Sequence, residues 1–263
     1  MKDVILSGRI LFGICMAALG AENVAVAHAE DKVMSVFPWL PPQPMLVYVT
    51  GTFLFVVGLA IAARIHPRLA SILLVIFLFV CELHVQWHRA THEPLDLGVR
   101  TNGFAVMALC AAGLTLAGMF RDHHKPRKKR SRADGLLMAG RYLFAISVLA
   151  FGTAHFLVGT HVAETLPAWL PLRVLWPYAA GIVFMVAGLS IALSWFDRLS
   201  ATLLGVTFLT WFAAVHLPHV IGSRHPYEVY EWSNMFIALA LCGACWIIAT
   251  ESLRRSHGNL AEA

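Results

Sequence analysis

Ionisable side chains occur within apolar stretches of this sequence, where they are costly and usually mark a functional site. His84, His88 and His92 recur every four residues, a spacing that places them on one face of a helix. Imidazole and carboxylate groups bind zinc, iron or manganese, and a catalytic metal site has about three protein ligands and an open position. Together with the carboxyl groups of Glu22 and Glu82, these histidines predict a metal or proton-transfer site.

Further histidines follow in the second half of the chain. His155 lies in one apolar stretch, and His216 and His219 lie in another, where Pro218 is expected to end or bend a helix. Axial histidines on separate helices are a common way to hold haem. Haem b and a divalent metal are therefore candidate cofactors, bound at one site or at two.

These residues are assigned three candidate roles. The candidate catalytic groups are Glu22, Glu82 and His155. The candidate cofactor ligands are His84, His155 and His216. The candidate metal ligands are His84, His88, His216 and His219. Each also has a structural alternative, because a histidine near a membrane surface is often a hydrogen-bonded interfacial residue. A pairing of either glutamate with Arg89, Arg100 or a histidine explains it equally well.

The composition shows what must position these groups. The chain has 263 residues, of which 59% are hydrophobic and 13% charged, and its mean hydropathy is +0.70. Apolar segments of about 20 residues span the bilayer, and within lipid they must be helical. We expect eight such segments, at residues 9–27, 45–63, 69–87, 101–119, 137–158, 177–195, 199–217 and 233–250.

The two halves of the sequence resemble each other. Gly8-Arg9 returns as Gly140-Arg141, 132 residues later. Further matches follow at Trp39-Leu40-Pro41 with Trp169-Leu170-Pro171, and at Pro94-x7-Asn102 with Pro226-x7-Asn234. We therefore predict an all-α transmembrane protein of two tandem parallel four-helix bundles, with repeats at 1–120 and 137–263 joined by a basic linker at 121–136. Four helices per repeat give both copies the same orientation, which argues against an inverted-repeat transporter.

The charges predict the orientation. The linker between Arg121 and Arg132 is rich in lysine and arginine, as cytoplasmic loops are, so we place both termini in the cytoplasm of a bacterial inner membrane protein. No nucleic-acid partner is expected. The first apolar segment resembles a cleavable signal peptide, but it aligns with an internal helix of the second repeat, which favours its retention.

The repeats differ near the outer surface. At a rise of 1.5 Å per residue, Asn23, His84, His155 and His216 all lie roughly 21–26 Å from the inner edge. Glu22 corresponds to Ala154, and Asn23 to His155. The third helix of the second repeat also has two more residues before His216 than the first repeat has before His84. We expect the chemistry to lie where the copies diverge.

A family resemblance rests on four elements. They are Arg141, Gly152-Thr153-Ala154-His155, Pro167-Ala168-Trp169-Leu170-Pro171, and the run from Tyr178 to Leu189. In this pattern residues 140–250 resemble the DoxX-like membrane family. The resemblance implies a four-helix unit and a role for His155. Some relatives are subunits of a thiosulfate:quinone oxidoreductase, so the resemblance adds a quinone to the candidate cofactors, while others are associated with thiol or oxidative-stress systems.

Two functional hypotheses follow. The first is a membrane redox component that transfers electrons or protons at an outer-face His/Glu site, in contact with quinone and an outer-face redox partner protein. The alternative is a non-catalytic binding or assembly protein that holds a lipid, a small apolar ligand or a partner helix. A continuous metal or proton conduit is disfavoured, because the inner half of the membrane contains few polar residues.

Overall fold

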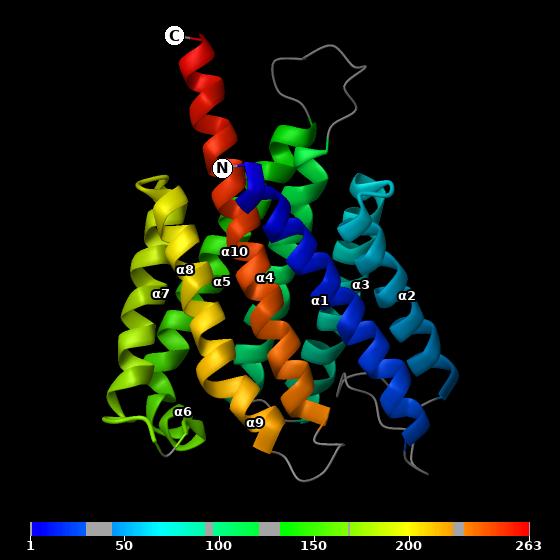
Figure 1. Ribbon diagram of the computed structural model, residues 1–263, viewed down its shortest axis with the longest axis vertical. Helices are drawn as coiled ribbons and strands as arrows, with labels where there is room; N and C mark the ends of the chain where they lie inside the picture. The colour runs from blue at the N-terminus through cyan, green and yellow to red at the C-terminus, as the bar shows by residue number, and fades with distance from the viewer. Residues whose placement is uncertain are drawn as a thin grey trace.

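All regular structure in the described part of the chain is helical. The computed structural model describes residues 2–29, 44–92, 97–120, 132–167, 169–222 and 229–262, and it contains no strand within these ranges (Figure 1). The predicted all-α class is confirmed for this part.

Within the described ranges, each half of the sequence supplies four long helices. In the first half they are α1 (Lys2–Ala29), α2 (Pro44–Ala63), α3 (Pro67–His92) and α4 (Leu97–Met119). In the second half they are α5 (Arg132–Leu157), α7 (Leu175–Leu193), α8 (Asp197–Trp211) and α10 (Val229–Glu262). Three short elements are added in the second half: α6 (Gly159–Thr165), the π-helical turn η1 (Phe212–His216) and α9 (Leu217–Gly222).

The helices have the length and composition of membrane spans. Seven of them, as far as the described residues extend, are long and apolar enough to cross a bilayer, and Gly103–Met119 of α4 forms a shorter apolar helix. Large apolar side chains such as Val56, Ile146 and Val186 are more than half exposed on the helix surfaces. Lipid tails accept such side chains, whereas water does not. The chain is therefore a multi-pass membrane protein.

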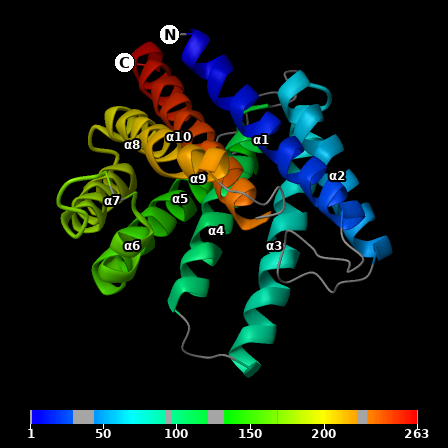
Figure 2. The same ribbon diagram turned by 60° about the horizontal axis from the view of Figure 1, so that its bottom comes forward.

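The two halves make the same set of helix contacts. In the first half α1 packs on α2, α2 on α3, and α3 on α4; in the second half α5, α7, α8 and α10 pair in the same order. Figures 1 and 2 show α4, α5 and α10 in the middle of the molecule. In addition, the first helix of each half packs on the last helix of the other half, as α1 on α10 and α5 on α4.

These contacts join the halves closely. The last helices, α4 and α10, also contact each other. The arrangement as two tandem bundles, the repeat boundaries and the cytoplasmic position of the termini remain predictions.

Glycines allow the closest helix approaches. A Cβ atom on Gly20 or Gly58 would lie within 3 Å of backbone atoms of the facing helix at the α1–α2 contact. At the α1–α10 contact, a Cβ on Gly243 would meet the backbone of Gly8 and Phe12. The corresponding α5–α4 contact brings Gly140 against the Ala111 carbonyl. Small residues let backbones approach within a membrane, where van der Waals packing drives helix association.

The turn between the second and third helices has the same backbone in both halves. Arg64 and His66 have φ angles of 65° and 42°, and Ser194 and Phe196 have φ angles of 60° and 51°. These pairs are separated by the same 130 residues as the Trp-Leu-Pro motifs. The repeat seen in the sequence is thus present in the backbone of this turn.

Candidate functional site

Glu22 lies in the C-terminal part of α1, where this helix meets α10. The Ser233 hydroxyl of α10 donates a hydrogen bond to Glu22 Oε1 at 3.0 Å. The other carboxyl oxygen, Oε2, is buried and has no hydrogen-bond partner among the described residues. The partner of this candidate catalytic carboxyl is therefore a serine from the second half of the chain.

The neighbouring residue, Asn23, joins α1 to α2. Its side chain is fully buried, and Nδ2 donates to the Val47 carbonyl at 3.3 Å and to Thr50 Oγ1 at 3.5 Å. The Thr50 hydroxyl in turn donates to the Leu46 carbonyl at 2.7 Å. These bonds make Asn23 a structural residue in the predicted outer layer.

Glu82 is buried where α3 packs on α4. Gln86, one helical turn further along α3, donates from Nε2 to Glu82 Oε1 at 2.5 Å. Gly103 of α4 faces this pair, and a Cβ there would lie 2.8 Å from Gln86 Nε2. The amide thus solvates the carboxyl group within the helix packing.

Of the candidate ligands His84, His88 and His92, only His84 has a described side chain. His84 is exposed on α3. Helix α3 continues to His92, so His84, His88 and His92 all lie on one continuous helix, as their four-residue spacing requires. The side chains of His88 and His92 lie outside the described residues.

His155 has a defined tautomer and an aromatic environment. Its Nδ1 atom lies 2.8 Å from the Phe151 carbonyl oxygen. Because a carbonyl only accepts hydrogen bonds, Nδ1 carries the proton and Nε2 of the neutral ring keeps a free lone pair. The ring meets Phe184 edge-on, with centroids 5.0 Å apart.

The aromatic cluster extends through three helices. Phe184 of α7 lies 5.9 Å from Phe151 of α5 and 5.5 Å from Phe208 of α8, measured between ring centroids. His155 is half-buried beside this cluster. It therefore combines a single hydrogen-bonding nitrogen with an apolar aromatic surface.

His216 and His219 follow a change in helix geometry. His216 is the last residue of η1, His219 lies in α9, and both are half-buried. A π-helical turn accommodates extra residues without rotating the segments on either side, and such turns are frequent at functional sites. Here it lies in the third helix of the second half, where the sequence has two residues more than in the first half.

The described side chains do not assemble a metal centre. No group of three or more His, Cys, Asp or Glu side chains among them could hold a metal ion. Because His88 is outside this set, the predicted metal ligands His84, His88, His216 and His219 remain a prediction.

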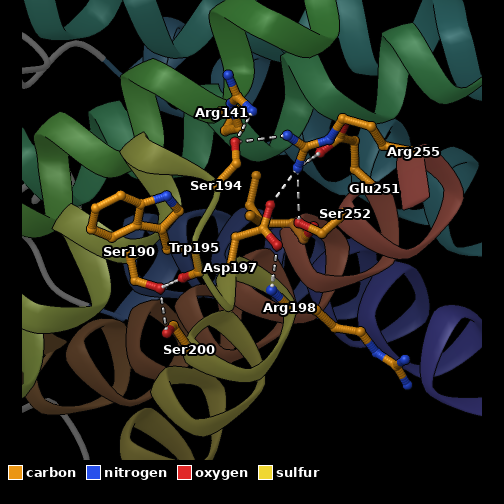
Figure 3. Close-up of polar contacts among 11 residues, drawn as sticks. Arg141, Ser190, Ser194, Trp195, Asp197, Arg198, Ser200, Glu251, Ser252 and Arg255 are labelled. Atoms are coloured by element: carbon orange, nitrogen blue, oxygen red, sulfur yellow. Dashed lines mark hydrogen bonds and ion pairs between the residues drawn. The ribbon is translucent and has the colours of Figure 1, made fainter. Parts of the chain in front are cut away.

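A polar network at the opposite end of the helices was not predicted (Figure 3). Arg255 of α10 forms an ion pair with Asp197 at the start of α8 and lies 3.5 Å from Glu251. It also donates to Ser194 Oγ at 2.9 Å, and Arg141 of α5 donates to the same hydroxyl. The network thus ties α5, α8 and α10 together through the α7–α8 turn.

The residues at the matching positions of the first half make different contacts. Arg9, which matches Arg141, is buried and donates to the carbonyls of Ile61 and Ala62 at 2.5 Å each. The acids of the network have no counterpart in the first half, where Pro67 matches Asp197 and Met119 matches Glu251. These mismatches between the repeats were the sequence signal that could have located the network.

Comparisons with known proteins give no identity. No protein-family model, no curated protein and no solved structure matches this chain. The fold and the described contacts define its class as a multi-pass helical membrane protein.

Proposed function

We propose that this protein is a membrane redox component of the DoxX-like type that binds a quinone in the outer layer of its second half. In this proposal eight helices form two tandem repeats in a bacterial inner membrane, with both termini in the cytoplasm. The observation that carries the proposal is the setting of His155, whose Nε2 is available while its ring lies against Phe184. A quinone carbonyl only accepts hydrogen bonds, so the protonated ring binds it through Nε2–H, and the neutral ring binds the quinol hydroxyl through the Nε2 lone pair. The aromatic surface packs against the apolar head group.

The chemistry assigns His155 a proton-transfer role. An electron donor at the outer face supplies two electrons, and the quinone takes them up with two protons to give the quinol. Protonated His155 donates one of these protons from Nε2 to a quinone oxygen and is then reprotonated from outer water. The second proton comes from water directly. A histidine suits this role because each ring nitrogen can bind a proton, so Nε2 can exchange one while Nδ1 keeps its bond to Phe151.

Binding of a quinone to the purified full-length protein tests the proposal. Short-chain benzoquinone and naphthoquinone analogues would be titrated into detergent-solubilised protein, with tryptophan quenching as the readout. We expect His155→Phe to weaken binding by about tenfold, the value of one hydrogen bond of about 1.4 kcal/mol. His161→Phe is the matched control, because His161 is an exposed histidine paired with Glu164.

Two outcomes would contradict the proposal. One is the absence of saturable quinone binding to the folded wild-type protein. The other is equal weakening by the His155 and His161 substitutions. An absorbance spectrum and metal analysis of the same sample test haem b and a divalent metal as the alternative cofactors.

A non-catalytic binding or assembly role is the second candidate. Both glutamates have internal partners, Ser233 for Glu22 and Gln86 for Glu82, as expected if they stabilise helix contacts. In that case joint substitution of His84, His88, His155 and His216 leaves the cellular phenotype of the protein intact. Loss of the phenotype on joint substitution, in a protein that still folds, would favour the redox role.

A further inference from the structure

The contact between α1 and α10 joins the two halves of the chain and contains a membrane-embedded acid. Near one end of this contact, a Cβ on Gly8 would lie 2.9 Å from Trp246 Cβ and 3.2 Å from the Ile247 nitrogen of α10. Towards the outer end, Glu22 of α1 accepts its hydrogen bond from Ser233 of α10. Glu22 lies within the apolar span Ser7–Ala25.

Only one of the two carboxyl oxygens of Glu22 has a hydrogen-bond partner among the described residues. One oxygen is bonded to Ser233, and the other is buried without a donor. Among the described side chains, no lysine, arginine or histidine forms an ion pair with Glu22. An ionised carboxylate in this position would have a desolvated charge without compensation, which is strongly unfavourable. A proton is small enough to reach the buried oxygen and removes the charge.

The sequence has no acid at the position that matches Glu22 in the related contact of the other half. By the 132-residue repeat, Glu22 matches Ala154 of α5, and Ser233 matches Thr101 of α4. Both contacts pair the first helix of one half with the last helix of the other. The carboxyl group is therefore dispensable for this kind of helix packing and is specific to the α1–α10 contact.

The described side chains at the level of Glu22 include few titratable groups. On α1 the neighbour is Asn23, and on α10 the neighbours of Ser233 are Trp232 and Asn234. On α2 the groups at this level are Thr50, bonded to Asn23, and Tyr48. Of these described side chains only Tyr48 is titratable.

We propose that Glu22 is a proton-binding site within the membrane, at which the carboxyl group is neutral near neutral pH and exchanges its proton with the outer side. Loss of the proton places a charge at the contact between the halves and weakens it. This site is separate from His155, and the inference does not depend on quinone binding.

Labelling with a hydrophobic carbodiimide tests the proposal. The protonated carboxyl group transfers its proton to a carbodiimide nitrogen while a carboxyl oxygen adds to the central carbon. The adduct then rearranges to a stable N-acylurea with no loss of atoms. An ionised carboxylate has no proton to give, so labelling reports the neutral form. Full-length protein in liposomes would be labelled over a range of pH and analysed by peptide mass spectrometry.

We expect Glu22 to gain the full mass of the reagent near neutral pH, and the yield to fall severalfold as the pH rises. Glu164 is the internal control, because its side chain is 77% exposed. A water-soluble carbodiimide with an added amine should give the reverse pattern, with Glu164 labelled and Glu22 protected.

Two variants complete the test. Glu22→Gln keeps the shape of a neutral carboxyl group and should keep the thermal unfolding midpoint while removing the adduct. Ser233→Ala removes the donor that stabilises the ionised form, so labelling of Glu22 should persist to higher pH. The proposal is overturned if folded protein shows no Glu22 adduct near neutral pH, or if the yield does not change with pH. Marked destabilisation by Glu22→Gln would equally contradict a neutral carboxyl group.

Discussion

Arg255 of α10 donates a hydrogen bond to Asp197 at the start of α8, across 58 residues of sequence. The same guanidinium group reaches Ser194 of the α7–α8 turn. Asp197 also accepts a bond from the Arg198 backbone N–H at 2.9 Å, so the carboxylate stabilises the beginning of its own helix as well. This contact fixes the end of α10 to the turn between two neighbouring spans.

Breaking this ion pair should destabilise the protein. Arg255→Ala leaves the carboxylates of Asp197 and Glu251 without their shared cation, and we expect a loss of about 1–3 kcal/mol. The measurement is thermal or denaturant unfolding in detergent. Arg254→Ala is the matched control, because Arg254 is exposed and makes one long bond of 3.5 Å to the Met119 carbonyl. Equal effects of the two substitutions would show that the network contributes nothing specific.

The glycine contact between α1 and α2 should tolerate no side chain. A Cβ on Gly58 would press on the backbone of Ala17 and Gly13, so Gly58→Ala should cost about 1–3 kcal/mol through overpacking. Gly135→Ala should have the opposite sign, because nothing lies within 4 Å of the new atom and alanine favours the helix by up to about 1 kcal/mol. Unfolding midpoints of the two variants in the same detergent provide the comparison. Similar shifts in both would argue against close α1–α2 packing.

The π-helical turn predicts an asymmetry between two deletions. Removal of Ala213 from η1 should convert the turn to α-helix and leave the orientation of His216 and His219 nearly unchanged. Removal of Leu203 from α8 should rotate all following residues of the helix by about 100° and bury the wrong face. We expect the first variant to be monodisperse in detergent and the second to aggregate. Aggregation of both would mean that the turn does not absorb an inserted residue.

The left-handed turn before α3 should be improved by glycine. His66 has a φ angle of 42°, a conformation that costs non-glycine residues about 1–2 kcal/mol. His66→Gly should therefore raise the unfolding free energy by about 0.5–1 kcal/mol, after the greater entropy of the unfolded glycine chain is included. Leu69→Gly is the contrasting substitution, since it places glycine inside α3 and should lower stability. A loss of stability in both variants would indicate that the His66 side chain has a role of its own.

Local signals in the sequence were sufficient to predict the long helices. Runs of apolar residues predicted the spans, and within α3 the structure pairs Glu82 with Gln86, one helical turn further along. The repeat of the motifs is accompanied by equal φ angles in the turns at Arg64 and Ser194. The short helix α6 and the π-helical turn were not predicted, because no local pattern distinguishes them from continued helix or loop.

Contacts between distant helices could not be predicted from the sequence. It identified Glu22 and His155 as candidate residues because ionisable groups are rare in apolar segments. Only the tertiary structure brings Ser233 to Glu22, across 211 residues, and Phe184 to the ring of His155. Such pairings depend on which helix faces meet and how closely they approach, and here glycines set that approach. Hydropathy and spacing along one helix contain no information on the partner helix, so the sequence determined the elements and the fold decided which side chains meet.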